Sequence, residues 1–168
     1  METKPFLVLG VGNPLWQDDG FGIAVAQRLL ERGVPPDADV IDGGTMGVYL
    51  LPYLEGRDAV IVVDAVHNNA PPGEIIRLAA ADVPRLPGLR LSEHQVTMQE
   101  VLTLTDLMES RPRDFLFFGC QPGSLQWGEP LSEPVEAAIP MVVEQVLEQL
   151  RCWREDFTRE CRERAVCA

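Results

Sequence analysis

Five side chains that could perform metal or acid–base chemistry are notable for their positions in the sequence. Asp18 and Asp19 follow the first apolar run, Asp42 follows a second, and Asp64 ends a third, while His94 lies in a polar segment. A carboxylate that ends an apolar run is costly to bury unless it is paired or binds a ligand. The three carboxylate segments together with the histidine could therefore form a metal site.

The elements that must position these residues alternate between two hydrophobic patterns. Short apolar runs predict buried strands, and apolar residues at helical spacing predict helices. The predicted strands are 6–11, 38–41, 59–63, 74–78 at an edge and 115–119; the predicted helices are 20–32, 46–54, 98–105 and 132–153, the last interrupted by Pro140.

This alternation predicts an α/β fold, a three-layer sandwich in which helices cover both faces of a mainly parallel, twisted sheet of about five strands. All 168 residues are expected to form one domain, with a charged tail that frays over 154–168. In such a sheet ligands bind beyond the carboxyl ends of the strands. The aspartates are expected there.

Composition excludes several classes of partner. The net charge of −12 disfavours nucleic acids and anionic membranes, both of which need basic surfaces. No apolar run reaches the roughly 20 residues that cross a bilayer, and the N-terminal segment does not resemble a signal peptide. The four cysteines show no regular spacing, so we expect a cytoplasmic protein without a disulfide framework.

Missing motifs narrow the chemistry further. Lys4 is the only lysine, which excludes a P-loop or Schiff-base lysine deep in the fold. His67 and His94 are the only histidines, so a metal site must consist largely of carboxylates. His67 is expected on the surface, and Cys120 is expected to be a small buried apolar side chain.

One alternative is dinucleotide binding, because Gly10 and Gly12 follow a strand. The third glycine of that fingerprint is replaced by Leu15, and Asp18 and Asp19 would repel a pyrophosphate at the helix entrance.

Each aspartate also has a purely structural interpretation. Asp18 or Asp19 could cap a helix, and Asp42 could stabilise the turn at Gly43 and Gly44 through an Asx-type bond. Asp64 could make a structural hydrogen bond, and His94 could face solvent or cap a helix. Trp16 and Trp127 could contact a partner or pack inward. The residues alone leave these alternatives open.

Taken in order, four motifs are specific to one family. They are GVGNPLWQDDGFG from Gly10, DGGT from Asp42, VVDA from Val62 and SEHQ from Ser92. The combination resembles the hydrogenase maturation endopeptidases, which trim the C-terminal extension of the large subunit of [NiFe] hydrogenases. The first motif looks most like the branch that serves membrane-bound uptake hydrogenases.

The resemblance implies a site. The family's metal contacts map onto Asp19, Asp64 and His94, and relatives often carry glutamate at position 19. Nickel would come with the precursor and bind transiently, and zinc or cadmium could occupy the same site. The family's DGGT loop implies a role in cleavage or substrate placement, with Asp42 as the catalytic candidate and Gly43, Gly44 and Thr45 as substrate contacts. Water is the leading nucleophile, activated either by the shared metal as a Lewis acid or by Asp42 as a base. The implied partner is the precursor of the large subunit, bound by a monomer.

Two other classes of function compete with this interpretation. The chain could be an independent metallohydrolase with its own bound ion, with His67 as a further ligand. It could also be a non-enzymatic domain that binds a nucleotide or metal and docks on a partner.

Overall fold

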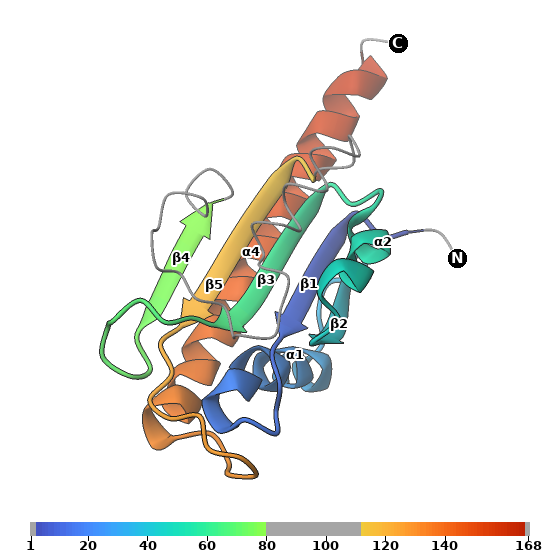
Figure 1. Cartoon of the computed structure of the whole chain (residues 1–168). Helices are drawn as coiled ribbons and strands as arrows, with labels where there is room; N and C mark the ends of the chain where they lie inside the picture. Colours follow the sequence, from blue (N-terminus) through green and yellow to red (C-terminus); the bar gives the residue numbers. More distant parts are fainter. Residues whose placement is uncertain (1–2, 80–111, 167–168) are drawn as a thin grey trace.

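A computed structural model describes residues 3–79 and 112–166, with side chains up to residue 159. Its five strands form one sheet in the order β2-β1-β3-β5-β4, in which only β4 is antiparallel to its neighbour (Figure 1). The strands are β1 (Phe6–Val11), β2 (Ala38–Gly44), β3 (Ala59–Ala65), β4 (Ile75–Ala79) and β5 (Asp114–Cys120).

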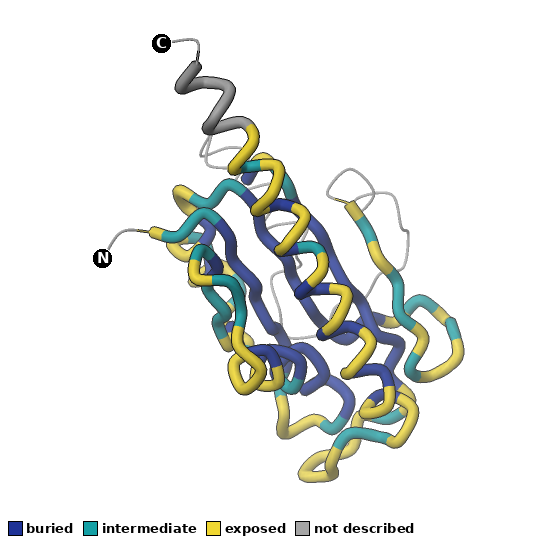
Figure 2. The backbone as a smooth tube through the Cα atoms, turned by 180° about the vertical axis from the view of Figure 1, so that it is seen from behind, coloured by how far each residue is buried: buried dark blue, intermediate teal, exposed yellow. Residues whose placement is uncertain are grey.

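The helical elements lie on both faces of the sheet, as the sequence predicted. Apolar residues of α1 (Phe21–Arg32) and α4 (Glu133–Val166) pack with one face of the strands, and Figure 2, the view from behind, shows α4 crossing in front of the sheet. The short segments η2 (Gly47–Leu50) and α2 (Leu51–Leu54) pack with the other face. A further 3-10 turn, η1 (Gln17–Gly20), precedes α1. The α/β prediction and the five-stranded, mainly parallel sheet are confirmed.

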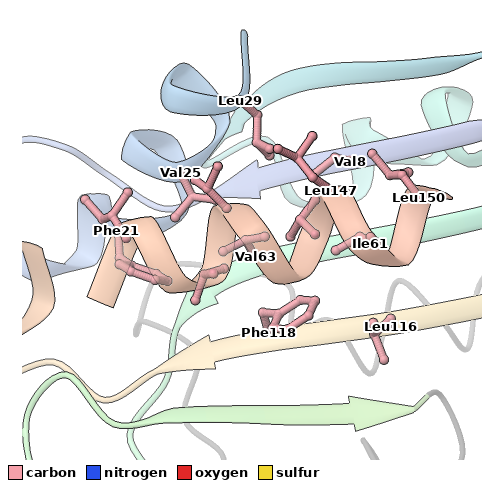
Figure 3. Close-up of a cluster of buried hydrophobic side chains, with 14 of the residues drawn as sticks. Val8, Phe21, Val25, Leu29, Ile61, Val63, Leu116, Phe118, Leu147 and Leu150 are labelled. Carbon is pink, nitrogen blue, oxygen red and sulfur yellow. The ribbon is translucent and has the colours of Figure 1, made fainter. Parts of the chain in front are cut away.

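Two apolar clusters hold the layers together. The larger one joins α1 and α4 to the sheet, and Figure 3 shows Phe21, Val25 and Leu29 beside Leu147 and Leu150 over strand side chains. Strand β3 is buried along its whole length, which explains its continuous apolar run. Each fully buried Leu, Ile or Phe stabilises the fold by about 1.5–3 kcal/mol.

The C-terminal helix differs from the sequence prediction. We expected the chain to fray from Arg154, but α4 continues to Val166. The ring of Phe157 packs edge-on against Phe6 at 6.0 Å between centroids, and Thr158 Oγ1 donates to the Arg154 carbonyl. Pro140 lies within the helix without ending it. The predicted helix 98–105 lies outside the described residues.

A close backbone contact positions the start of α1. A Cβ atom on Gly22 would lie 2.2 Å from the Val63 carbonyl oxygen and 2.3 Å from that of Val11. The first turn of α1 therefore rests directly on the ends of β1 and β3. A Cβ on Gly10 would likewise lie 2.2 Å from the Gly22 oxygen.

Gly22→Ala should destabilise the fold by about 3 kcal/mol, because the added methyl group meets backbone atoms that cannot rotate away. Urea denaturation measures the change. The exposed variant Gln27→Ala on the same helix is the control and should stay within about 0.5 kcal/mol of the wild type. A Gly22→Ala protein as stable as the wild type would contradict this packing.

Candidate functional site

Asp19 is placed by the loop that leaves β1. Its side chain is only 6% exposed, and its Oδ2 accepts a hydrogen bond of 2.9 Å from the Asn13 N–H. The loop needs Gly12 at φ 133°, a conformation that other residues rarely adopt. The chain thus folds back on itself between Gly12 and Asp19, and the Asp19 carboxylate points into the protein.

Asp64 lies at the end of β3, beside this loop. It is 3% exposed, and its Oδ1 accepts a hydrogen bond of 2.8 Å from the Ala65 N–H. A Cβ atom on Gly12 would be 1.9 Å from the Asp19 carbonyl oxygen and 3.7 Å from Asp64 Oδ1. The absence of a side chain at Gly12 therefore lets Asp19 and Asp64 approach the same point.

This point is the switch point of the sheet. From β1 the chain proceeds to β2 on one side, and β3 then pairs on the other side. Crevices that bind ligands form where the strand order reverses, beyond the carboxyl ends of the strands. Asp19 and Asp64 occupy the region where such a site is expected.

Electrostatics make the pair unfavourable in isolation. Burial raises the pKa of Asp64 well above its usual 3.8, the neighbouring Asp19 charge raises it further, and the Ala65 N–H opposes this only in part. A divalent cation would offset both unfavourable effects. Two carboxylates also supply the oxygen ligands that divalent metals accept. The donor set of these two residues fits a metal.

The predicted third ligand, His94, lies outside the described residues. Within residues 3–79 and 112–159, no group of three His, Cys, Asp or Glu side chains could hold a metal ion. The trio Asp19, Asp64 and His94 therefore stays a prediction. His67, considered above as a further ligand, is exposed, and its Nδ1 lies 3.5 Å from Gln121 Nε2.

The DGGT segment forms an irregularity at the end of β2. Gly10 of β1 pairs with Asp42 and Val11 pairs with Gly44, so Gly43 is an extra, bulged residue. The Gly44 N–H donates to Asp42 Oδ1 at 3.0 Å, which is the Asx-type bond considered above. Asp42 and Thr45 are both exposed.

Asp42 belongs to the same edge of the sheet as the buried pair. Gly10 pairs with Asp42 on one side and with Val63 on the other. Two strand spacings thus separate Asp42 from Val63, a distance of roughly 10 Å between their backbones. A peptide lying across the end of β1 could reach both Asp42 and the Asp19–Asp64 pair.

Asp18 has a role that the sequence did not indicate. It is completely buried, and its carboxylate accepts four hydrogen bonds from the segment after β5. The donors are the N–H groups of Gly123, Ser124 and Ser132 and the Ser132 hydroxyl, at 2.7–2.9 Å. Neither Asp18 nor Asp19 caps η1 or α1 with its side chain. Asp18 instead joins two loops that are distant in sequence.

Cys120 is not suited to act as the nucleophile. It is completely buried at the end of β5. Burial, with a smaller effect from the Asp18 charge, raises the pKa of its thiol to about 12. A nucleophilic cysteine needs a lowered pKa. The expectation that Cys120 is a small buried side chain is confirmed.

Comparisons with known proteins agree with this architecture. A family model described as hydrogenase maturation protease matches residues 23–149. The hydrogenase expression/formation protein HupD of Bradyrhizobium diazoefficiens is 39% identical over 161 residues, covering 94% of this chain and 84% of that protein. The hydrogenase 2 maturation protease of Escherichia coli is 37% identical over 148 residues, covering 86% of this chain and 90% of that protein.

Solved structures share the fold. The hydrogenase maturating endopeptidase HybD from E. coli superposes with a TM-score of 0.79 at 36% identity, covering 87% of this chain and 91% of HybD. The maturation protease HycI from Thermococcus kodakarensis superposes with a TM-score of 0.72 at 29% identity, covering 88% of this chain and 93% of HycI. The doubly wound α/β fold of this chain is thus shared with a group of peptidases. The chain belongs to the hydrogenase maturation protease family and is an endopeptidase of that class.

Asp64→Asn should change how stability depends on pH. Because the pKa of Asp64 is raised in the folded protein, the carboxylate adds no destabilisation below pH 3.8 and destabilises increasingly as pH rises toward the raised value. The amide keeps the shape and the Ala65 hydrogen bond without ionising. The variant should therefore gain free energy of unfolding relative to the wild type as pH rises from 4 to 8.

Chemical denaturation across this pH range, in buffers containing a chelator, measures the difference. Asp114→Asn is the control, because Asp114 lies at the opposite end of β5 and pairs with Arg113. A constant difference between Asp64→Asn and the wild type would contradict the raised pKa of Asp64.

Asp18→Asn should lower the free energy of unfolding by about 3 kcal/mol, because an amide group cannot accept all four hydrogen bonds and leaves buried donors unsatisfied. Ser132→Ala removes only one of the four and should cost about 1 kcal/mol. Thermal denaturation compares the two variants. Equal losses would show that the Asp18 carboxylate does not hold the loop together.

Proposed function

We propose that this endopeptidase removes the C-terminal extension of a [NiFe] hydrogenase large-subunit precursor that has already received its nickel. The observation that supports this most is the buried Asp19–Asp64 pair at the switch point, whose charges favour a divalent cation. His94 completes the proposed ligand set. The subgroup that acts on membrane-bound uptake hydrogenases is the proposed branch.

The nickel belongs to the substrate in this proposal. Three protein ligands leave coordination positions open, so the ion could remain bound to the precursor while it contacts Asp19, Asp64 and His94. Weak affinity for free metal would serve the enzyme, because a protease already loaded with metal could not distinguish nickel-loaded from metal-free precursor. Zinc or cadmium would fit the same oxygen and nitrogen ligands.

Peptide cleavage is assigned to water. Asp42 is exposed at the end of β2, where it can accept a proton from a water molecule that attacks the scissile carbonyl carbon. The proton then passes to the amine that leaves. Gly44 is partly exposed and has no side chain to obstruct a substrate backbone, and Thr45 is exposed beside it. Gly43, the third predicted substrate contact, is buried against Leu50.

We also propose that the enzyme acts in the cytoplasm, as a monomer that binds the precursor transiently. No helix in the described part of the chain is long and apolar enough to cross a membrane.

Processing of purified precursor, followed by its mass shift, tests the proposal. Nickel-loaded precursor should be cut, and metal-free precursor should not. Asp19→Asn, Asp64→Asn, His94→Ala and Asp42→Asn should each lower the rate of cleavage at least about 100-fold, as expected for loss of a ligand or a general base. Asp114→Asn, at the far end of the sheet, should cleave normally.

Asp42 and the metal-contact residues should differ in one respect. Asp42→Asn should still bind nickel-loaded precursor, because its proposed role is in the chemical step. Equal cleavage of loaded and metal-free precursor would refute nickel recognition, and normal cleavage by Asp42→Asn would remove Asp42 from the mechanism.

A further inference from the structure

Four large apolar side chains are exposed at the end of the sheet that carries the site. Leu15, Trp16, Leu125 and Trp127, which we call the tryptophan platform, are 51%, 40%, 40% and 62% exposed. The rings of Trp16 and Trp127 contact edge to face, with 5.4 Å between centroids and 79° between planes. Grouped exposed apolar residues mark contact surfaces in soluble proteins.

Hydrogen bonds between two loops hold the platform in place. Its residues come from the loop after β1 and the loop after β5, which lie side by side in Figure 1. The Gly128 N–H donates to the Leu15 carbonyl at 2.9 Å, and the Gln126 N–H donates to Gln17 Oε1 at 3.1 Å. The Asp18 carboxylate holds the loop after β5 by accepting hydrogen bonds from the N–H groups of Gly123 and Ser124. The tryptophans are therefore exposed on an ordered surface, which lowers the entropic cost of binding.

The platform is also connected to the site. The Asp19 N–H donates to the Trp16 carbonyl at 3.0 Å, and the Asn13 N–H donates to Asp19 Oδ2 at 2.9 Å. The loop that presents Trp16 therefore also holds the Asp19 carboxylate. A protein that binds the platform would be placed in a defined position relative to Asp19 and Asp64.

The charge around the platform defines its partner. No Lys or Arg occurs in residues 5–27 or 114–150, the two stretches that contain the platform loops. Glu129, Glu133 and Glu136 are exposed immediately after Trp127. A complementary surface would therefore present apolar side chains next to Lys or Arg, and the net charge of −12 would attract such a surface over a distance.

A shallow pocket adjoins the platform. It has a volume of about 110 Å³ and is lined in part by Pro14, Ile23, Pro130 and Leu131. Pro14 precedes Leu15, and Pro130 follows Glu129, so the pocket opens beside the same two loops. An apolar side chain of the partner could be anchored here, as binding hot spots commonly are.

We propose that the tryptophan platform is the docking surface for the protein substrate and binds a segment of the precursor that presents apolar side chains flanked by Lys or Arg. This inference rests on the proposed function, because it takes the precursor as the substrate. The platform supplies affinity and alignment, while the residues at the switch point act on the metal and the scissile bond.

The double variant Trp16→Ala/Trp127→Ala tests the platform with nickel-loaded precursor as the substrate. We expect KM to rise at least about 10-fold while kcat changes less than about twofold, which corresponds to the loss of uniform binding. Leu125→Ser is a second variant that leaves both rings in place and should raise KM in the same direction. Thermal denaturation verifies that each variant is folded.

Two kinds of control variant test whether the rise in KM is specific to the tryptophan platform. Leu30→Ala and Met141→Ala remove apolar side chains that are 57% and 47% exposed on α1 and α4, and they should leave KM unchanged. Tyr49→Ala tests a competing surface, because Tyr49 is 74% exposed after β2. A rise in KM for Tyr49→Ala with none for the tryptophan variant would overturn the proposal.

Neutralising the acidic residues beside the platform gives an independent test. Glu129→Gln/Glu133→Gln should raise KM about threefold at low salt and make KM less sensitive to added salt. If the KM of the wild type does not rise with added salt, the prediction that the partner presents Lys or Arg next to its apolar side chains is wrong.

Direct binding separates this inference from the proposed function. The wild type should bind purified precursor, and the tryptophan variant should bind it at least about 10-fold more weakly, whether or not cleavage follows. Weakened binding without any cleavage by the wild type would retain the platform and reject the proposed reaction. Normal cleavage with equal binding by both proteins would retain the reaction and reject the platform, and absence of binding by the wild type would reject both.

Discussion

The structure depends on the direct backbone contact between the first turn of α1 and the ends of β1 and β3. Gly22 lies against the carbonyl oxygens of Val11 and Val63, where no side chain could fit. This contact forces the chain between β1 and α1 to turn back over the sheet, and it carries Asp19 toward Asp64. Two buried carboxylates at one point raise the pKa of Asp64 and store unfavourable electrostatic energy. A cation at this point would offset that energy, so the packing of the helix would be physically linked to the proposed recognition of a metal.

Asp18 and Asp19, adjacent in the loop between β1 and α1, have different roles. Asp18 points toward the segment after β5 and is satisfied by four hydrogen bonds, whereas Asp19 lies beside the end of β3. The first fixes the loops, and the second is available for the proposed metal contact. The exposed tryptophans stand on the loops that Asp18 joins, so the same carboxylate would support substrate docking. The loop between β1 and α1 would therefore contribute both to the stability of the fold and to the proposed binding of the substrate.

Local patterns were sufficient to predict most of the fold. The apolar runs at β1, β3 and β5 and the helical spacing in α1 depend on burial, which is visible in the sequence. The role of Asp18 was not predictable, because its partners are 105–114 residues away and three of the four are backbone N–H groups, which carry no sequence signal. The continuation of α4 was missed because the contact of Phe157 with Phe6 is tertiary. The carboxylates were recognisable as candidates because each follows a strand, but their convergence depends on Gly12 and Gly22, whose packing no local pattern reveals.

The central claim is that Asp19, Asp64 and His94 contact one metal ion. A crystal of the protein soaked with nickel or cadmium, measured at the absorption edge of the metal, tests this most directly. We predict one strong anomalous peak at the switch point, with carboxylate oxygens of both aspartates and a ring nitrogen of His94 within about 2.0–2.5 Å, as metal–ligand distances require. A peak elsewhere, or a peak that lacks any one of these three ligands, would contradict the account.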